Sequence, residues 1–89
     1  MTDFKFYKVS VNIDFLNTKG LLGNYNNEND YRLEMKAIRH YKDSVWETQG
    51  LINNSISIND DFYIKADITL YGITFDNEYV IMRHLQLTM

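Results

Sequence analysis

The sequence predicts an α+β fold, in which an antiparallel sheet of four to five strands carries one helix on its apolar face. Strongly alternating segments near both ends of the chain indicate strands, and a segment of helical periodicity lies between them. A chain of 89 residues without cysteine is expected to form one small domain, residues 1–89, that packing alone stabilises.

The first predicted strand has an apolar side chain at every second residue from Tyr7 to Phe15, with polar residues between them. This period of two is typical of a strand with one buried face. Phe4 and Phe6 lie in the opposite phase. Either a β-bulge near Phe6 and Tyr7 or coverage of the strand on both faces there is therefore expected.

The segment from Leu16 to Asp30 is predicted to be a long loop, because it contains two glycines and five asparagines. Both residue types favour turns and positive φ. A loop of about 15 residues is unusual in a small domain and is often functional.

Residues 30–44 are predicted to form the helix, with Asn29 or Asp30 as its cap. The segment is ambiguous, because its first residues also alternate as a strand would. The helical pattern extends further, however, and reaches Val45. The apolar residues of the expected helix face are Tyr31, Met35, Ala37, Ile38, Tyr41 and Val45. The alternative is a strand over residues 31–42, which would make the protein an all-β barrel or sandwich.

After the helix the chain is predicted to return to strands, at residues 45–52 and 55–58, joined by a turn at Asn53 and Asn54. The last third, residues 62–89, then predicts a long β-hairpin with one dry and one wet face.

Matching the apolar faces sets the register of this hairpin, because a slip of one residue would reverse every side chain. The pattern predicts a three-residue turn at 76–78 and a bulge at Tyr71 and Gly72. The expected pairs are Phe75 with Tyr79, Ile73 with Ile81, Ile68 with Leu85, Ala66 with Leu87 and Ile64 with Met89. Arg83 then lies opposite Leu70 on the apolar face, where a buried unpaired cation would be costly.

The composition excludes some classes of protein. No apolar run approaches the roughly 20 residues of a membrane span, and residues 1–3 do not resemble the start of a signal peptide, so the cytoplasm is the expected compartment. A net charge of −3 argues weakly against a nucleic-acid partner.

No residue pattern predicts a catalytic, cofactor-binding or metal site. Asn24 to Met35 begins like a calcium-binding loop, but its sixth residue is Asn29 instead of glycine and its twelfth is not glutamate. His40 and His84 lack the spacing of metal ligands. The predicted register places His84 diagonal to Asp67, without a nearby nucleophile. The protein is therefore predicted not to be an enzyme and to need no cofactor.

The favoured hypothesis is a non-enzymatic protein-binding module, and in particular a small phage- or mobile-element-encoded inhibitor of a host protein. Small size, acidic balance and frequent Asn, Ile and Tyr, whose codons are A/T-rich, support it indirectly. The partner would be another protein, and a homodimer through a sheet edge is also plausible in such a small domain. The residues expected to bind the partner are Asn24, Tyr25, Asn26, Asn27, Glu28 and Arg83.

The alternative hypothesis is a small single-stranded nucleic-acid-binding domain. Arg32, Lys36 and Arg39 form the clearest basic stripe of the chain. Neighbouring aromatic residues could stack on bases while these cations bind phosphates. The aromatic residues in question are Tyr31, Tyr41 and Trp46.

Overall fold

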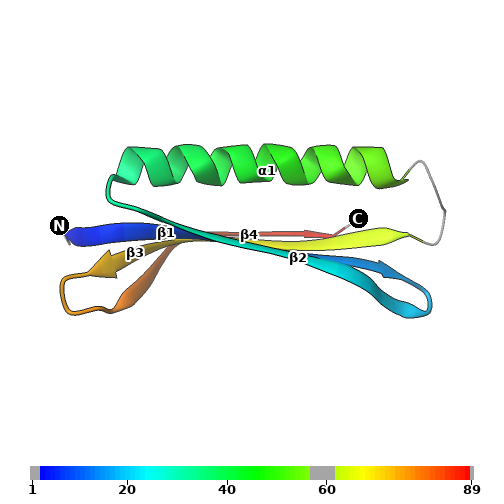
Figure 1. The fold of residues 1–89 in the computed structure, drawn as a ribbon, viewed down its shortest axis with the longest axis horizontal. Coiled ribbons are helices and arrows are strands. Elements are labelled where there is room, and N and C mark those ends of the chain that lie inside the picture. The colour runs from blue at the N-terminus through cyan, green and yellow to red at the C-terminus, as the bar shows by residue number, and fades with distance from the viewer. Residues whose placement is uncertain (1–2, 57–61, 89) are drawn as a thin grey trace.

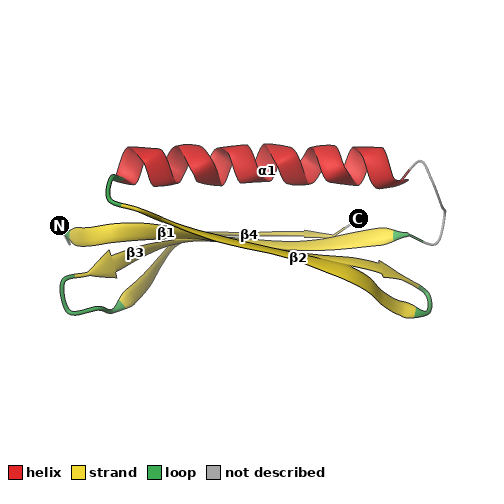
Figure 2. Ribbon diagram, viewed as in Figure 1, coloured by secondary structure: helices red, strands yellow, loops and turns green. Residues whose placement is uncertain are grey.

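The computed structural model describes residues 3–56 and 62–88 and confirms the predicted α+β class (Figures 1 and 2). One helix lies along one face of a four-stranded antiparallel sheet, and the described strands do not close into a barrel. The strand order is β2-β1-β3-β4. In chain order the elements are β1 (Phe4–Asn17), β2 (Gly20–Tyr31), α1 (Glu34–Ile56), β3 (Tyr63–Thr74) and β4 (Tyr79–Thr88).

The sheet is built from two hairpins that meet along their first strands. β1 pairs with its own hairpin partner β2 on one side and with β3 on the other, so Val9 lies between Asn29 and Leu70. The pairing of β1 with β3 shifts register between Phe4 and Phe6, which confirms the predicted irregularity near Phe6. β2 and β4 are left as the two edge strands.

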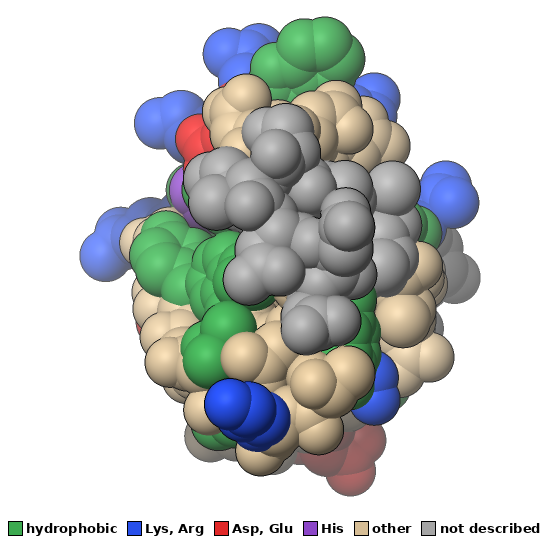
Figure 3. Space-filling view, turned by 90° about the vertical axis from the view of Figure 1, so that its right-hand side faces the viewer, with side chains coloured by type: hydrophobic (Ala, Val, Ile, Leu, Met, Phe, Trp, Pro, Cys, Tyr) green, Lys and Arg blue, Asp and Glu red, His purple; other side chains and the backbone are tan. Residues whose placement is uncertain are grey.

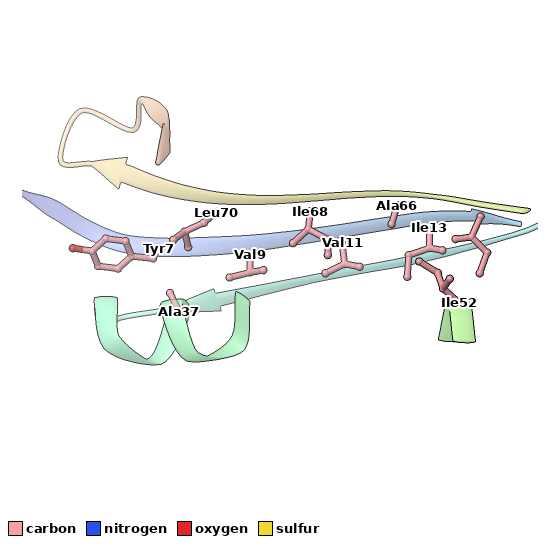
Figure 4. Packing of buried hydrophobic residues seen from close by; sticks show 10 residues of the cluster. Tyr7, Val9, Val11, Ile13, Ala37, Ile52, Ala66, Ile68 and Leu70 are labelled. Atoms are coloured by element: carbon pink, nitrogen blue, oxygen red, sulfur yellow. The ribbon is translucent and has the colours of Figure 1, made fainter. Parts of the chain in front are cut away.

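The core lies between the two central strands and the helix (Figure 4). Alternation along β1 and β3 turns the apolar side chains of both strands toward α1, as the pattern predicts. The side chains with the least exposure in this cluster are Val9, Ile13, Ile64, Ile68 and Leu70 from the strands and Ala37 and Ile52 from the helix.

The helix begins at Glu34, later than predicted, and ends at Ile56, twelve residues beyond the expected end at 44. The predicted strand at 45–52 is therefore wrong. The predicted strand at 55–58 is also wrong at its first two residues, which are helical, and its last two residues lie outside the described range. The buried face of the helix carries small side chains along much of its length. Ala37, Ser44 and Thr48 recur at helical spacing, and their small side chains allow the helix to lie close to the sheet. Met35, expected on this face, is exposed instead.

The Asn-rich segment is a strand and not the predicted loop. β1 continues to Asn17, a turn follows at Thr18 and Lys19, and β2 begins at Gly20. Asn and Gly have low intrinsic β-propensity, but an edge position and cross-strand side-chain hydrogen bonds can override it. The alternative strand over residues 31–42 is also wrong, since α1 occupies most of that range.

The β3–β4 hairpin follows the predicted register only in the half away from its turn. Ile68 lies opposite Leu85, Ala66 opposite Leu87 and Leu70 opposite Arg83, all as predicted. Met89, the predicted partner of Ile64, lies outside the described residues.

Near the turn the predicted pairing is wrong. Ile73 lies opposite Tyr79 instead of Ile81, because the connection is four residues long, Phe75 to Glu78, with Asn77 at a φ of 63°. The hairpin does contain a bulge, but the bulge is in β4 and not at the predicted Tyr71 and Gly72 of β3. Its extra residue is Met82, which has no partner in β3.

Gly72 is required for packing. It lies opposite Tyr7, and a Cβ atom there would be 2.7 Å from the ring of Phe4. The ring of Phe4 also meets that of Tyr7 edge-on, with centroids 5.6 Å apart. The glycine thus allows the first aromatic residue of β1 to cover the end of the core.

We expect Gly72→Ala to lower the free energy of unfolding by roughly 1–3 kcal/mol, because the Phe4 ring must move. Denaturant unfolding followed by circular dichroism measures the change. Gly50→Ala is the matched control: no atom lies within 4 Å of the added carbon and the residue is helical, so a gain of about 0.5–1 kcal/mol is expected. Equal effects of the two substitutions would contradict this role of Gly72.

The first turn of the helix is tied to the sheet through Tyr7. Burial raises the pKa of the Tyr7 phenol, and the negative charge of Glu34 and a hydrogen bond to its carboxylate raise it further. A pKa above its unfolded value, near 10, means that folding favours the protonated phenol. Its contribution to stability is complete below pH 10 and is lost as the pH rises through the folded pKa.

The free energy of unfolding should accordingly fall above pH 10, and less steeply in Tyr7→Phe than in the wild-type protein. Urea titrations between pH 8 and 11 test this. Tyr25→Phe, at an exposed position on the edge strand, is the control and should keep the wild-type slope. Identical slopes for Tyr7→Phe and the wild type would show that Tyr7 does not couple folding to pH.

Candidate functional site

A groove with a volume of about 540 Å³ lies between α1 and the edge strand β2. Its floor is apolar, because Val11, Ile13 and Phe15 alternate toward the helix side of β1. The groove lies toward the end of the molecule that holds the β1–β2 hairpin. Figure 3 shows this end, where hydrophobic side chains (green) reach the surface beside a histidine (purple).

The helix forms one wall of the groove with residues that recur every three or four positions. His40, Ser44, Thr48 and Leu51 therefore lie on one side of α1. The Thr48 hydroxyl donates to the Ser44 carbonyl at 2.7 Å, so it is satisfied inside the helix and leaves its methyl group for packing. Glu47 adds an exposed carboxylate to the rim.

The strand forms the other wall with a chain of side-chain amides. Asn29 donates to the side chain of Asn27 at 2.8 Å, and Asn27 donates to the Tyr25 hydroxyl at 3.1 Å. The amide of Asn29 also lies 3.2 Å from Nε2 of His40, which links the strand to the helix. These contacts hold the polar side chains of the wall in fixed positions beside an apolar floor.

Tyr31 closes the row at the end of β2. Its ring packs 5.4 Å from that of His40, measured between centroids. Burial raises the pKa of Tyr31, and the negative charge of Asp43 raises it further. The phenol therefore stays protonated at neutral pH.

The opposite face of β2 is also tied to β1. The amide of Asn24 donates to the side chains of Asn12 at 2.7 Å and Asp14 at 2.6 Å, and Asn26 donates to Asn24. Cross-strand contacts of this kind stabilise a sheet. The asparagines that predicted a loop are thus the residues that hold this strand in place.

The predicted partner-binding residues therefore lie on an ordered strand edge. Asn24, Tyr25, Asn26 and Glu28 are exposed, and Asn27 is half-buried in the wall of the groove. The sequence identified this segment but not its conformation, and it did not reveal the groove. Helical spacing of small residues on α1 was the signal that could have found it.

Arg83, the sixth predicted residue, lies far from this cluster. It is exposed opposite Leu70 and lines a second groove, of about 550 Å³, on the β4 side of the helix. Within residues 3–56 and 62–88 no carboxylate forms an ion pair with it. Its charge stays in water at the sheet edge, which avoids the cost of a buried cation.

The residues of the nucleic-acid alternative are only partly brought together. Arg32, Lys36 and Arg39 are exposed around the start of the helix. Of the aromatic residues expected beside them, Tyr31 and Tyr41 pack against the core, whereas Trp46 is 76% exposed on the outer face of α1.

The second histidine takes the predicted position on the wet face of the sheet. His84 lies opposite Thr69, and its Nε2 contacts the carboxylate of Asp67. Both side chains are largely exposed, and the pair lines neither of the grooves beside the helix. Among the described residues no group of three His, Cys, Asp or Glu side chains could hold a metal ion.

Comparison with known proteins adds no relationship. No protein-family model, curated protein or solved structure matches the chain. The helix of the described part is not apolar enough over its length to cross a membrane.

Proposed function

We propose that this protein is a non-enzymatic protein-binding module that takes up an extended segment of its partner as an extra strand beside β2. The observation that carries the proposal is the groove between α1 and β2, an edge strand that pairs with no other described strand on its outer side. Strand addition combines backbone hydrogen bonds along such an edge with pockets for alternate side chains.

The geometry of β2 defines the chemistry of the segment. Every second side chain would point to the helix side, beside Tyr25 and Asn27 at the rim of the apolar groove, so apolar residues are expected there. The other side chains would lie beside Glu28 and Asp30 on the open face of the sheet. β2 carries no cation, which favours Lys or Arg at these positions.

A module of this kind can act by occlusion, since it would cover a strand or a linear motif that its partner needs elsewhere. We extend the proposal to a narrower role, in which a phage or mobile element encodes this protein and the protein inhibits a protein of the host. Small size and A/T-rich codon preference support this narrower role.

Selection from a displayed library of ten-residue peptides tests the binding mode. We expect selected peptides to alternate apolar and basic residues and to shift backbone amide resonances of β2 and of the groove residues of α1. Glu28→Lys should weaken the binding of a selected peptide about five- to thirtyfold, because one attraction becomes a repulsion.

The control is Glu78→Lys, which makes the same change of charge in the β3–β4 hairpin. It should leave the affinity for the selected peptide unchanged. Selected peptides that shift β4 instead of β2, or that bind Glu28→Lys as tightly as the wild type, would overturn the proposed binding mode. A library that yields no consensus would do the same.

Single-stranded nucleic-acid binding stays the second candidate, because the exposed Trp46 lies on the same outer face of the helix as Arg39 and Lys42. Titration of labelled oligonucleotides at several salt concentrations separates the two functions. Micromolar binding that weakens steeply with salt and is lost in Trp46→Ala would favour the nucleic-acid function. Absence of binding at low salt would eliminate it.

A further inference from the structure

The first half of β4 exposes apolar side chains on both of its faces. Tyr79, Val80 and Ile81 are 56%, 40% and 60% exposed, and the adjoining Phe75 is 72% exposed. Tyr79 and Ile81 lie on the open face of the sheet, where the ring of Tyr79 contacts that of Tyr71. An uncharged, apolar edge segment of this kind is a template for pairing with another chain.

The molecule as a whole exposes more surface than a monomer of its size requires. The chain exposes 6323 Å², whereas a folded monomer of 10.6 kDa is expected to expose about 5,500 Å². The radius of gyration is 15.0 Å, against about 12 Å for a compact chain of this length. The excess area of roughly 800 Å² follows from the elongated shape of the chain and is comparable with the area that each partner buries in an interface of standard size.

The backbone of this segment is poised for symmetric pairing. The Thr74 amide donates to the Glu78 carbonyl at 3.0 Å, and the register continues from this pair to Gly72 opposite Val80. Hydrogen-bonded pairs alternate along an antiparallel ladder, so Val80 bonds inward to β3. The amides and carbonyls of Tyr79 and Ile81 therefore point outward, one on each side of Val80.

We propose that a second copy of this chain pairs antiparallel with this segment about a two-fold axis at Val80. Tyr79 of each copy then exchanges both backbone hydrogen bonds with Ile81 of the other, and the two Val80 residues face each other. The apolar side chains of both copies cover one another, and the two sheets join into one continuous sheet.

Other registers on β4 are less favourable. An axis at Arg83 would bring two like charges directly opposite each other. An axis at Ile81 would place the unpaired bulge residue Met82 inside the new ladder, where the regular hydrogen-bond pattern is broken. On β2, the other edge, acidic side chains at Glu28 and Asp30 alternate along the strand.

Sedimentation velocity and cysteine cross-linking test the dimer together. At micromolar concentration the full chain should sediment at twice its 10.6 kDa mass, and Ile81→Lys should weaken the dimer at least about tenfold. Because the chain has no cysteine, Val80→Cys introduces a single thiol. Facing residues of a non-hydrogen-bonded pair have Cα atoms about 4.5 Å apart, within the range of a disulfide. Val80→Cys should therefore oxidise to a covalent dimer.

Leu21→Lys and Asn27→Cys are the matched controls on β2. The first should leave the dimer intact, and the second should form no covalent dimer. A wild-type monomer would overturn the proposal, and so would a dimer that Leu21→Lys dissociates and Ile81→Lys does not. Circular dichroism of each variant separates loss of pairing from loss of fold. Glu28→Lys, which tests the peptide-binding edge, should remain dimeric, so each proposal can fail without the other.

Discussion

A single helix cannot cover a four-stranded sheet, and the arrangement of this molecule depends on that mismatch of widths. Four strands spaced about 4.8 Å apart make a sheet roughly 19 Å wide, whereas a helix with its side chains is about 10–12 Å across. α1 packs mainly on β1 and β3 and less on β2, and it is separated from β4 by the groove that Ile38 and Tyr41 share with Met82 and Arg83. The core therefore forms under the middle strands, and a groove opens on each side of the helix.

The two grooves differ because the two edge strands differ. Asn27 and Asn29 of β2 present their amides to its groove, and hydrogen bonds along the strand and a contact with His40 of the helix hold them in place. β4 presents Met82, Leu85 and Leu87, which are half-buried and pack against the core. Each edge also has one register shift, near Leu22 in β2 and at Met82 in β4. Each shift interrupts the regular row of backbone hydrogen-bonding groups on its edge strand. Only the short regular stretches on either side of it can pair with another strand.

The central strands could be predicted because their alternation reflects burial on one face. Val9, Val11, Ile64 and Ile68 lie where the pattern places them. The segments that were predicted wrongly depend on contacts distant in the sequence. Nothing local to Asn24 indicates that its amide will meet Asn12 and Asp14 across a strand.

The candidate site was predicted in part. The helix was predicted too short because its buried face beyond Tyr41 uses Ser44 and Thr48, polar residues that contribute no apolar periodicity. The segment predicted to bind a partner lies beside the groove, but the groove itself depends on where α1 lies, which no local pattern specifies. The exposure of Tyr79 and Ile81 could not be predicted either, because it depends on the position of the bulge. A shift of one residue at Met82 moves both side chains to the other face of the sheet.

The pairing of β1 with β3 also has a consequence for synthesis. The sheet joins residues as distant as Tyr7 and Gly72, so the first hairpin and α1 are synthesised before the strand that pairs with the inner edge of β1. During that interval the edge of β1 that later pairs with β3 is unpaired, and Val9, Val11 and Ile13 lack the neighbouring side chains of β3. The order of translation thus leaves the apolar face of β1 incomplete until most of the chain has been made, and exposed apolar surface of this kind is what chaperones recognise on nascent chains.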